Sequence, residues 1–134
     1  MTIPQAVAEE LHQGQAFVGI WHETPGAKAI QVVSIPVDPL TTQFLVTLHA
    51  GEAEALTLAI RQGAQVLLCD DMDARRVAGY HRVPVSGTLG ILIRAKRAGF
   101  IQAVTPHLDR LRQEIRFWIR DDLYHQIQEV AGEI

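Results

Sequence analysis

Three groups of acidic residues are spaced so that they could hold a metal ion together. They are Glu9 with Glu10, Glu52 with Glu54, and Asp70 with Asp71, with Asp73 close behind the last pair. Hard divalent cations bind carboxylate oxygens and water. Three or four such carboxylates on separate elements could hold Mg²⁺ or Mn²⁺ for phosphodiester hydrolysis, because a bound metal generates hydroxide and stabilises a charged transition state.

Each acidic group also has a structural interpretation. Acidic residues in the first turn of a helix complement its dipole, which accounts for Glu52 and for Glu54. An aspartate after a strand often caps the next helix, which accounts for Asp70 or Asp71. The first acidic pair can simply face solvent. Any one group alone favours the structural interpretation, so a metal site requires that the groups converge in space.

The elements that would position these acids follow an α/β order. Apolar periodicity and helix-breaking residues predict the following elements: a helix from Thr2 to about Gly14, irregular chain over 14–28, a strand over 30–37, and helices over 41–48 and 51–62. The pattern continues with a strand over 66–69, a helix over 73–78, a strand over 83–86, and helices over 88–99, 106–115 and 122–131. Gly63 is expected to end the helix over 51–62, and Asp121 to cap the last helix.

Alternation of helices and strands from residue 51 predicts a parallel sheet with right-handed crossovers. Ligands of such sheets bind beyond the carboxyl ends of the strands. Asp70 and Asp71 follow the apolar run 66–69, so they lie at such an end.

Composition predicts one globular domain over residues 1–134. Hydrophobic residues make up 48% and charged residues 20% of the 134 residues. With no apolar run of membrane length and no signal peptide, we expect a cytoplasmic protein without a membrane partner. The one cysteine, Cys69, excludes a disulfide scaffold and a zinc ribbon, and we interpret it as a core residue.

Charge is distributed unevenly along the chain. Residues 1–60 carry one cation and six anions, whereas residues 74–120 carry ten cations and two anions. A basic half beside an acidic cluster could bind a polyanion next to a metal site. The alternative is that these cations coat solvated helix faces, and the sequence alone favours that alternative.

Most of the chain resembles one subfamily of PIN domains, which has a Gly-Glu-Ala-Glu-Ala signature. The residues that carry the resemblance are Leu48–Ala55, Leu58, Ala59, Leu67–Asp71, Arg75, Ala78, Gly87–Gly90, Ala95, Lys96 and Gly99, together with Ile3–Val7, Glu10 and Leu11. The resemblance implies a three-layer α/β/α fold around a parallel sheet. It also implies a Mg²⁺- or Mn²⁺-dependent ribonuclease acting on single-stranded RNA, like the toxins of toxin–antitoxin pairs.

The resemblance further implies roles for individual residues. The catalytic acids of the family correspond to Glu10, Glu52 and Asp70. The metal ligands correspond to the same three residues together with Asp71. Two alternatives remain: Glu54 in place of Glu52, and Asp71 in place of Asp70. Candidate nucleic-acid-binding residues are Arg75, Thr88 and Lys96. Arg75 could instead brace the carboxylates or form a structural salt bridge.

One part of the family pattern has no counterpart in this sequence. The family's first strand, its helix and an aspartate ligand are missing, which fits a late start codon, a truncation or a degenerate copy. In the family that strand lies mid-sheet, so unpaired ladder groups and apolar faces predict that the chain self-associates. The expected function is therefore either a ribonuclease, with a small antitoxin-like protein as a candidate partner, or an inactive module that binds a protein or itself. Whether the chain is an enzyme stays open at this point.

Overall fold

A computed structural model describes residues 1–18 and 23–134, with side chains for residues 1–14 and 23–134. The chain divides into two compact units, an N-terminal unit over Met1–Val85 and a C-terminal unit over Ser86–Ile134. Within the part of the chain that the structure describes, no helix is both long enough and apolar enough to cross a membrane.

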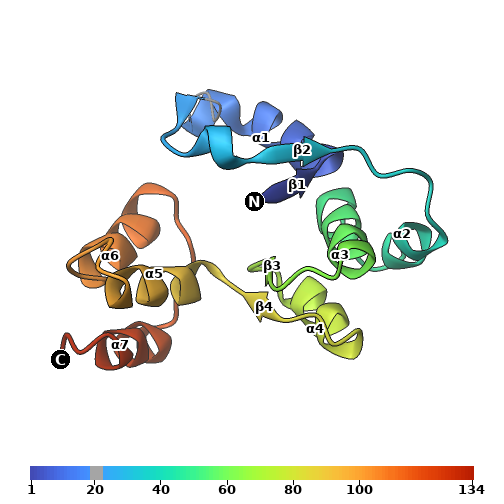
Figure 1. The fold of residues 1–134 in the computed structure, drawn as a ribbon. Coiled ribbons are helices and arrows are strands. Elements are labelled where there is room, and N and C mark those ends of the chain that lie inside the picture. Colours follow the sequence, from blue (N-terminus) through green and yellow to red (C-terminus); the bar gives the residue numbers. More distant parts are fainter. Residues whose placement is uncertain (19–22) are drawn as a thin grey trace. The chain divides into compact units, whose positions relative to one another are not determined.

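The N-terminal unit combines helices with short strands (Figure 1). Its elements are β1 (Thr2–Pro4), α1 (Gln5–Val18), a 3-10 helix (Ala27–Ala29), β2 (Gln31–Val33), α2 (Pro39–Phe44), α3 (Ala50–Gln62), β3 (Leu67–Leu68) and α4 (Met72–Tyr80). The boundary between the units falls within β4 (Val85–Ser86). β1 and β2 are parallel, and β3 pairs with β4. This mixture of helices and short paired strands confirms the α/β class.

The core of the N-terminal unit holds α3 against its neighbours. Phe44 of α2, Leu56 of α3 and Leu67 of β3 are buried in one apolar cluster. Thr57, fully buried on α3, accepts a hydrogen bond from Thr41 of α2 at 2.8 Å. These contacts fix α3, the helix that carries the central acidic pair.

Three helices make up most of the C-terminal unit: α5 (Thr88–Arg97), α6 (Thr105–Glu114) and α7 (Asp121–Val130). Figure 1 shows them grouped together. Their buried core consists of Val104, Leu108, Ile119 and Ile127.

The structure corrects two predictions at the N-terminus. Thr2–Pro4 is a strand and not the first turn of a helix, because Thr2 pairs with Gln31, far along the chain. The helix does not stop near Gly14 but continues to Val18. An interior glycine costs a helix roughly 0.5–1 kcal/mol, which tertiary contacts can offset. Residues 19–22 of the segment predicted as irregular lie outside the described residues.

Of two further predicted helix ends, one is confirmed and one is wrong. Gly63 ends α3 with a φ of 60°, as predicted for a left-handed C-terminal glycine. The predicted cap of α7 is wrong: Arg120 is the N-cap residue, and Asp121 is the first helical residue. Among the described residues, the predicted parallel pairing of strands takes the form of two small sheets, β1–β2 and β3–β4.

Candidate metal centre

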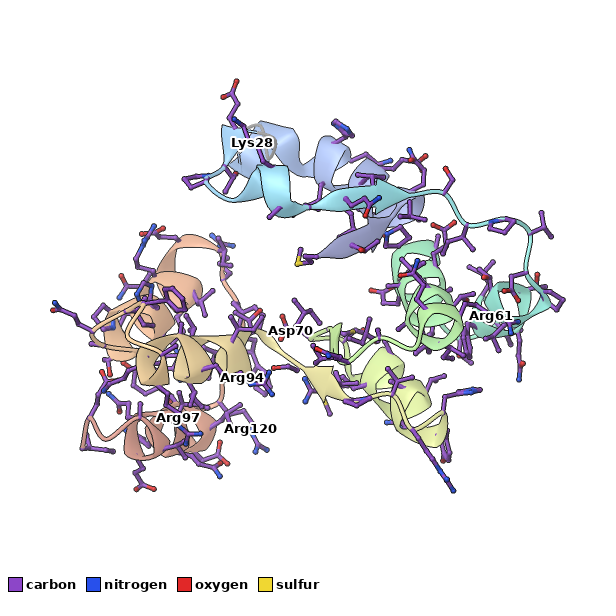
Figure 2. All side chains as sticks on the ribbon, in the orientation of Figure 1. Lys28, Arg61, Asp70, Arg94, Arg97 and Arg120 are labelled. Carbon is purple, nitrogen blue, oxygen red and sulfur yellow. The ribbon has the colours of Figure 1, made fainter. Side chains whose placement is uncertain are left out.

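A cavity of about 270 Å³ in the N-terminal unit brings the acidic groups together. It is lined by Val7, Glu10, Gly51, Glu52, Ala55, Leu67, Leu68, Cys69, Asp70, Asp71 and Ala74. All four predicted metal ligands are in this set. They come from α1, from the start of α3 and from the chain after β3, where Figure 2 labels Asp70.

Glu10 lies directly against the first turn of α3. A methyl group added at Gly51 would be 2.8 Å from Cδ of Glu10 and 2.9 Å from its Oε2. Those distances are shorter than real carbon contacts, so the carboxylate occupies space that only a glycine leaves open. The positive end of the α3 dipole also favours a carboxylate at this place.

Glu52, the next residue along α3, has an unsatisfied oxygen. Its Oε2 atom is buried and accepts no hydrogen bond from any described residue. A buried carboxylate oxygen without a partner is costly, and most such atoms in folded proteins are paired. A cation bound in the cavity would supply the missing partner.

Asp71 combines a structural role with a place in the cavity. Its Oδ1 accepts a hydrogen bond from the Ala74 N–H at 2.8 Å and so caps α4. The structural interpretation of an aspartate after a strand is therefore confirmed for Asp71. Arg75 donates a hydrogen bond to the Cys69 carbonyl at 3.1 Å, which braces the segment that carries both aspartates.

The pKa of the Cys69 thiol reflects the negative charges around it. Burial raises the pKa of its thiol, and the negative charges of Asp71, Glu52 and Asp70 raise it further, against a weaker opposing hydrogen bond with the Asp71 backbone. The thiol therefore stays protonated near neutral pH, in keeping with its interpretation as a core residue. Its surroundings also show that carboxylates from α3 and from the end of β3 act on one point.

Glu54 is held outside this cavity. Its Oε2 accepts a hydrogen bond from the Ala6 N–H at 2.9 Å, so it caps the first turn of α1. Two residues along a helix turn a side chain by about 200°. Glu52 is therefore the acid of α3 that faces Glu10, and Glu54 joins α3 to the helix that carries Glu10. Glu9 is exposed and accepts a hydrogen bond from Gln5 Nε2 at 3.5 Å.

The acids line one cavity without forming a finished coordination shell. Within residues 1–18 and 23–134, no three His, Cys, Asp or Glu side chains are grouped closely enough to hold a metal ion. The chemistry of the donors nevertheless fits a hard divalent cation, because all four are carboxylates. Glu52 supplies the unsatisfied oxygen, and Gly51 leaves the space for Glu10.

The two remaining candidates, Thr88 and Lys96, belong to the C-terminal unit. The Lys96 ammonium donates to the Ala131 carbonyl at 2.6 Å and lies 3.3 Å from Glu133 Oε2, with a quarter of its side chain exposed. Thr88 begins α5 and lines a separate cavity of about 220 Å³. Nucleic-acid binding by Arg75, Thr88 and Lys96 stays a prediction, and Lys96 would have to leave its partners to bind a phosphate.

A family model described as a PIN domain matches residues 1–133, nearly the whole chain. The chain belongs to the PIN-domain family. This match covers both units of the PIN domain. Membership of the family suggests a nuclease, and PIN domains generally use divalent metals. No curated protein and no solved structure matches the chain.

Two residues of this PIN domain have roles that the sequence alone does not predict. Gly51 is part of the signature, and a glycine beside an acidic helix start can also indicate a close approach of another side chain. Glu54 is the alternative metal ligand in the sequence prediction, whereas in the structure its long-range bond to Ala6 joins α1 to α3. Only the packing of these two helices could reveal that bond.

Proposed function

We propose that this PIN domain is a Mg²⁺- or Mn²⁺-dependent ribonuclease that hydrolyses phosphodiester bonds of single-stranded RNA. The observation that supports it best is the unsatisfied, buried Oε2 of Glu52, in a cavity shared with Glu10, Asp70 and Asp71. Membership of the family makes a nuclease the class of activity to test.

The carboxylates have distinct tasks in this proposal. Glu10, Glu52 and Asp70 would hold the cation, while Asp71 adds charge to the cavity and keeps its bond to α4. A bound divalent cation would supply a hydroxide nucleophile and stabilise the charge that develops on phosphorus. Without a cation, the same carboxylates repel the phosphates of RNA, because like charges in a shielded cavity are poorly screened.

The test is cleavage of a labelled single-stranded RNA by the purified chain with Mn²⁺, with EDTA, and with the Asp70→Asn variant. We expect cleavage that needs Mn²⁺ and that the Asp70→Asn substitution strongly reduces. Cleavage that persists in EDTA or in the variant would point to a contaminating nuclease and contradict the proposal.

A second candidate function is a module that self-associates, and one observation favours it. An apolar cavity of about 590 Å³ lies in the N-terminal unit between β1 and β3, next to Leu58 of α3. Each of these strands pairs on one side only among the described residues. An unpaired strand edge beside apolar side chains is a template for pairing with another chain.

Self-association is tested by light scattering at micromolar concentration. We expect a mass above that of a monomer, and a monodisperse monomer would contradict this second function. A small antitoxin-like partner remains a prediction from the family resemblance, and co-expression with a candidate antitoxin would test it.

A further inference from the structure

The segment between α6 and α7 displays an exposed tryptophan between two arginines. Residues 116–120 have the sequence Arg-Phe-Trp-Ile-Arg and form neither helix nor strand. Arg116, Trp118 and Arg120 are exposed, with Trp118 80% exposed, whereas Phe117 is half-buried and Ile119 is buried. Such alternation is typical of extended chain with one side on a core. The indole and both guanidinium groups therefore project from the solvent side of this segment.

The inner side of the segment is anchored to the C-terminal unit. Phe117 and Ile119 pack in its hydrophobic core. The Phe117 N–H donates to the Leu111 carbonyl at 2.9 Å, and the Ile119 carbonyl accepts from Arg112 Nη2 at 2.7 Å. An anchored backbone lowers the entropy lost on binding, so the exposed side is ready to receive a ligand.

Arg116 has a backbone conformation that a glycine would adopt with less strain. Its φ is 52°, in the left-handed region, and it follows Ile115, the C-cap residue of α6. Glycine is the usual residue at such a position, and other residues pay roughly 1–2 kcal/mol there. The Arg116 side chain has no hydrogen bond or ion pair with any described residue. Nothing within the described fold therefore requires this guanidinium, which leaves it available for an anion.

Arg120 forms a weak, solvent-exposed ion pair. Its Nη2 lies 3.0 Å from Asp122 Oδ2, in an ion pair whose side chains are 62% and 69% exposed. Exposed pairs of this kind contribute between about 0 and 1 kcal/mol, so a phosphate could replace Asp122. Figure 2 labels two more exposed arginines of this unit, Arg94 and Arg97 on α5, and neither is in an ion pair with a described residue.

We infer that Arg116, Trp118 and Arg120 form a platform that binds single-stranded RNA, with a base stacked on the indole and phosphates bound by the guanidinium groups. Stacking on aromatic side chains together with cationic contacts to the backbone is how proteins hold single strands without reading their sequence. An exposed tryptophan could also bind a protein, but the unpaired Arg116 beside it favours a polyanion. This inference rests on the proposed function, since it takes the ligand from the substrate of that function.

Intrinsic fluorescence can follow this binding directly. The chain has two tryptophans, Trp21 and Trp118, so a Trp21→Phe background leaves Trp118 as its only indole. We would titrate this protein, carrying Asp70→Asn and kept in EDTA, with a polyuridine strand of about ten nucleotides, a length within the range of single-strand sites. We expect saturable quenching of Trp118 emission that weakens as salt is added. No quenching would overturn the inference.

Two variants measure the platform in a fluorescence-polarisation assay with the labelled strand. Trp118→Ala should weaken binding about tenfold, the loss expected for one stacked base. Arg116→Gly should weaken it severalfold while thermal stability stays equal or rises, because glycine relieves the left-handed strain. The control is Arg82→Gly, since Arg82 is also exposed and has a φ of 57°. Equal losses at Arg82 and Arg116 would overturn the inference.

The outcomes separate this platform from the nuclease. RNA that binds through Trp118 but is never cut supports the platform and contradicts the proposed function. Cleavage by the wild-type chain with unchanged affinity in Trp118→Ala supports the function and contradicts the platform. Trp118 emission that changes with protein concentration and not with RNA would overturn the platform in favour of a protein interface.

Discussion

Two shielded glutamates, one in each unit, have opposite surroundings. In the C-terminal unit, Glu133 accepts hydrogen bonds from the N–H groups of Val104 and Thr105 at 2.8 and 3.1 Å and pairs with Lys96. In the N-terminal unit, the buried Oε2 of Glu52 has no partner among the described residues. The Glu133 carboxylate is therefore paired within its own unit, whereas Glu52 has a buried oxygen that a ligand could bind.

The pKa of Glu133 shows how completely its charge is stabilised. Burial acts to raise this pKa, but the bonds from Val104, Thr105 and Lys96 outweigh it and hold the pKa at about 2. Glu133 is therefore ionised in the folded protein at neutral pH because it caps the start of α6. The comparison teaches that burial alone does not identify a functional acid; the lack of a partner does.

The two acids of α3 repeat the comparison over a shorter distance. Glu54 accepts the Ala6 N–H, whereas Glu52, two residues earlier, faces the cavity. The partner of Glu54 makes it a structural residue that positions α1. Glu10 reaches the cavity from that same helix.

The largest effect should come from Glu52→Gln. Loss of this charge should reduce Mn²⁺-dependent RNA cleavage about 100-fold or more, because the amide binds a divalent cation far more weakly. Thermal stability should hardly change, since the buried Oε2 atom has no hydrogen-bond partner among the described residues. Single-turnover cleavage and thermal unfolding measure the two effects. Glu133→Gln is the matched control and should keep its cleavage rate. Equal losses of cleavage in the two variants would contradict the assignment of a functional role to Glu52 and a structural role to Glu133.

Glu133→Gln should instead destabilise the protein, by about 2 kcal/mol, because charge-assisted bonds to the start of α6 are lost. Since the pKa of Glu133 falls from 4.5 to about 2 on folding, its contribution is complete above about pH 4.5 and disappears as the pH falls towards 2. Urea unfolding of wild type and variant at several pH values checks this. A difference in stability that is constant from pH 7 to about pH 2.5 would refute the assigned role.

Gly51→Ala should weaken Mn²⁺ binding about tenfold, which is typical when a ligand is displaced. The added methyl group collides with the Glu10 carboxylate, and that flexible side chain has to move away from α3. Titration calorimetry with Mn²⁺ measures the effect. Gly79→Ala on α4 is the control, because no described residue beyond its own helix backbone and chain neighbours lies within 4 Å of the added methyl group. The helix should gain up to about 1 kcal/mol. Unchanged Mn²⁺ affinity in Gly51→Ala would separate Glu10 from the metal site.

The smallest effect should come from Glu54→Gln. The amide oxygen can still accept the Ala6 N–H, but the charge is lost, so we expect a loss of about 1 kcal/mol or less. Amide hydrogen exchange should become faster in the first turn of α1, with less change in Mn²⁺ affinity than in Gly51→Ala. Faster exchange spread evenly over the protein would argue against a local cap.

Local interactions made part of the fold predictable. The helix over 51–62 and its end at Gly63 follow from strong helix formers and a left-handed glycine, both of which act within a few residues. A cap by Asp70 or Asp71 is predictable for the same reason, since the bond that Asp71 forms with Ala74 spans three residues. The strand Thr2–Pro4 could not be predicted in this way, because its partner is the distant segment Gln31–Val33.

The sequence by itself determined the acidic groups, the α/β order of elements and the family resemblance that the family match bears out. Tertiary structure alone decided between Glu52 and Glu54, because the face that α3 turns towards α1 depends on packing between residues far apart in the chain. Tertiary structure also decided that Lys96 forms an ion pair with Glu133. Residue types specify which chemistry is available, but only the three-dimensional fold decides which charged groups are already satisfied.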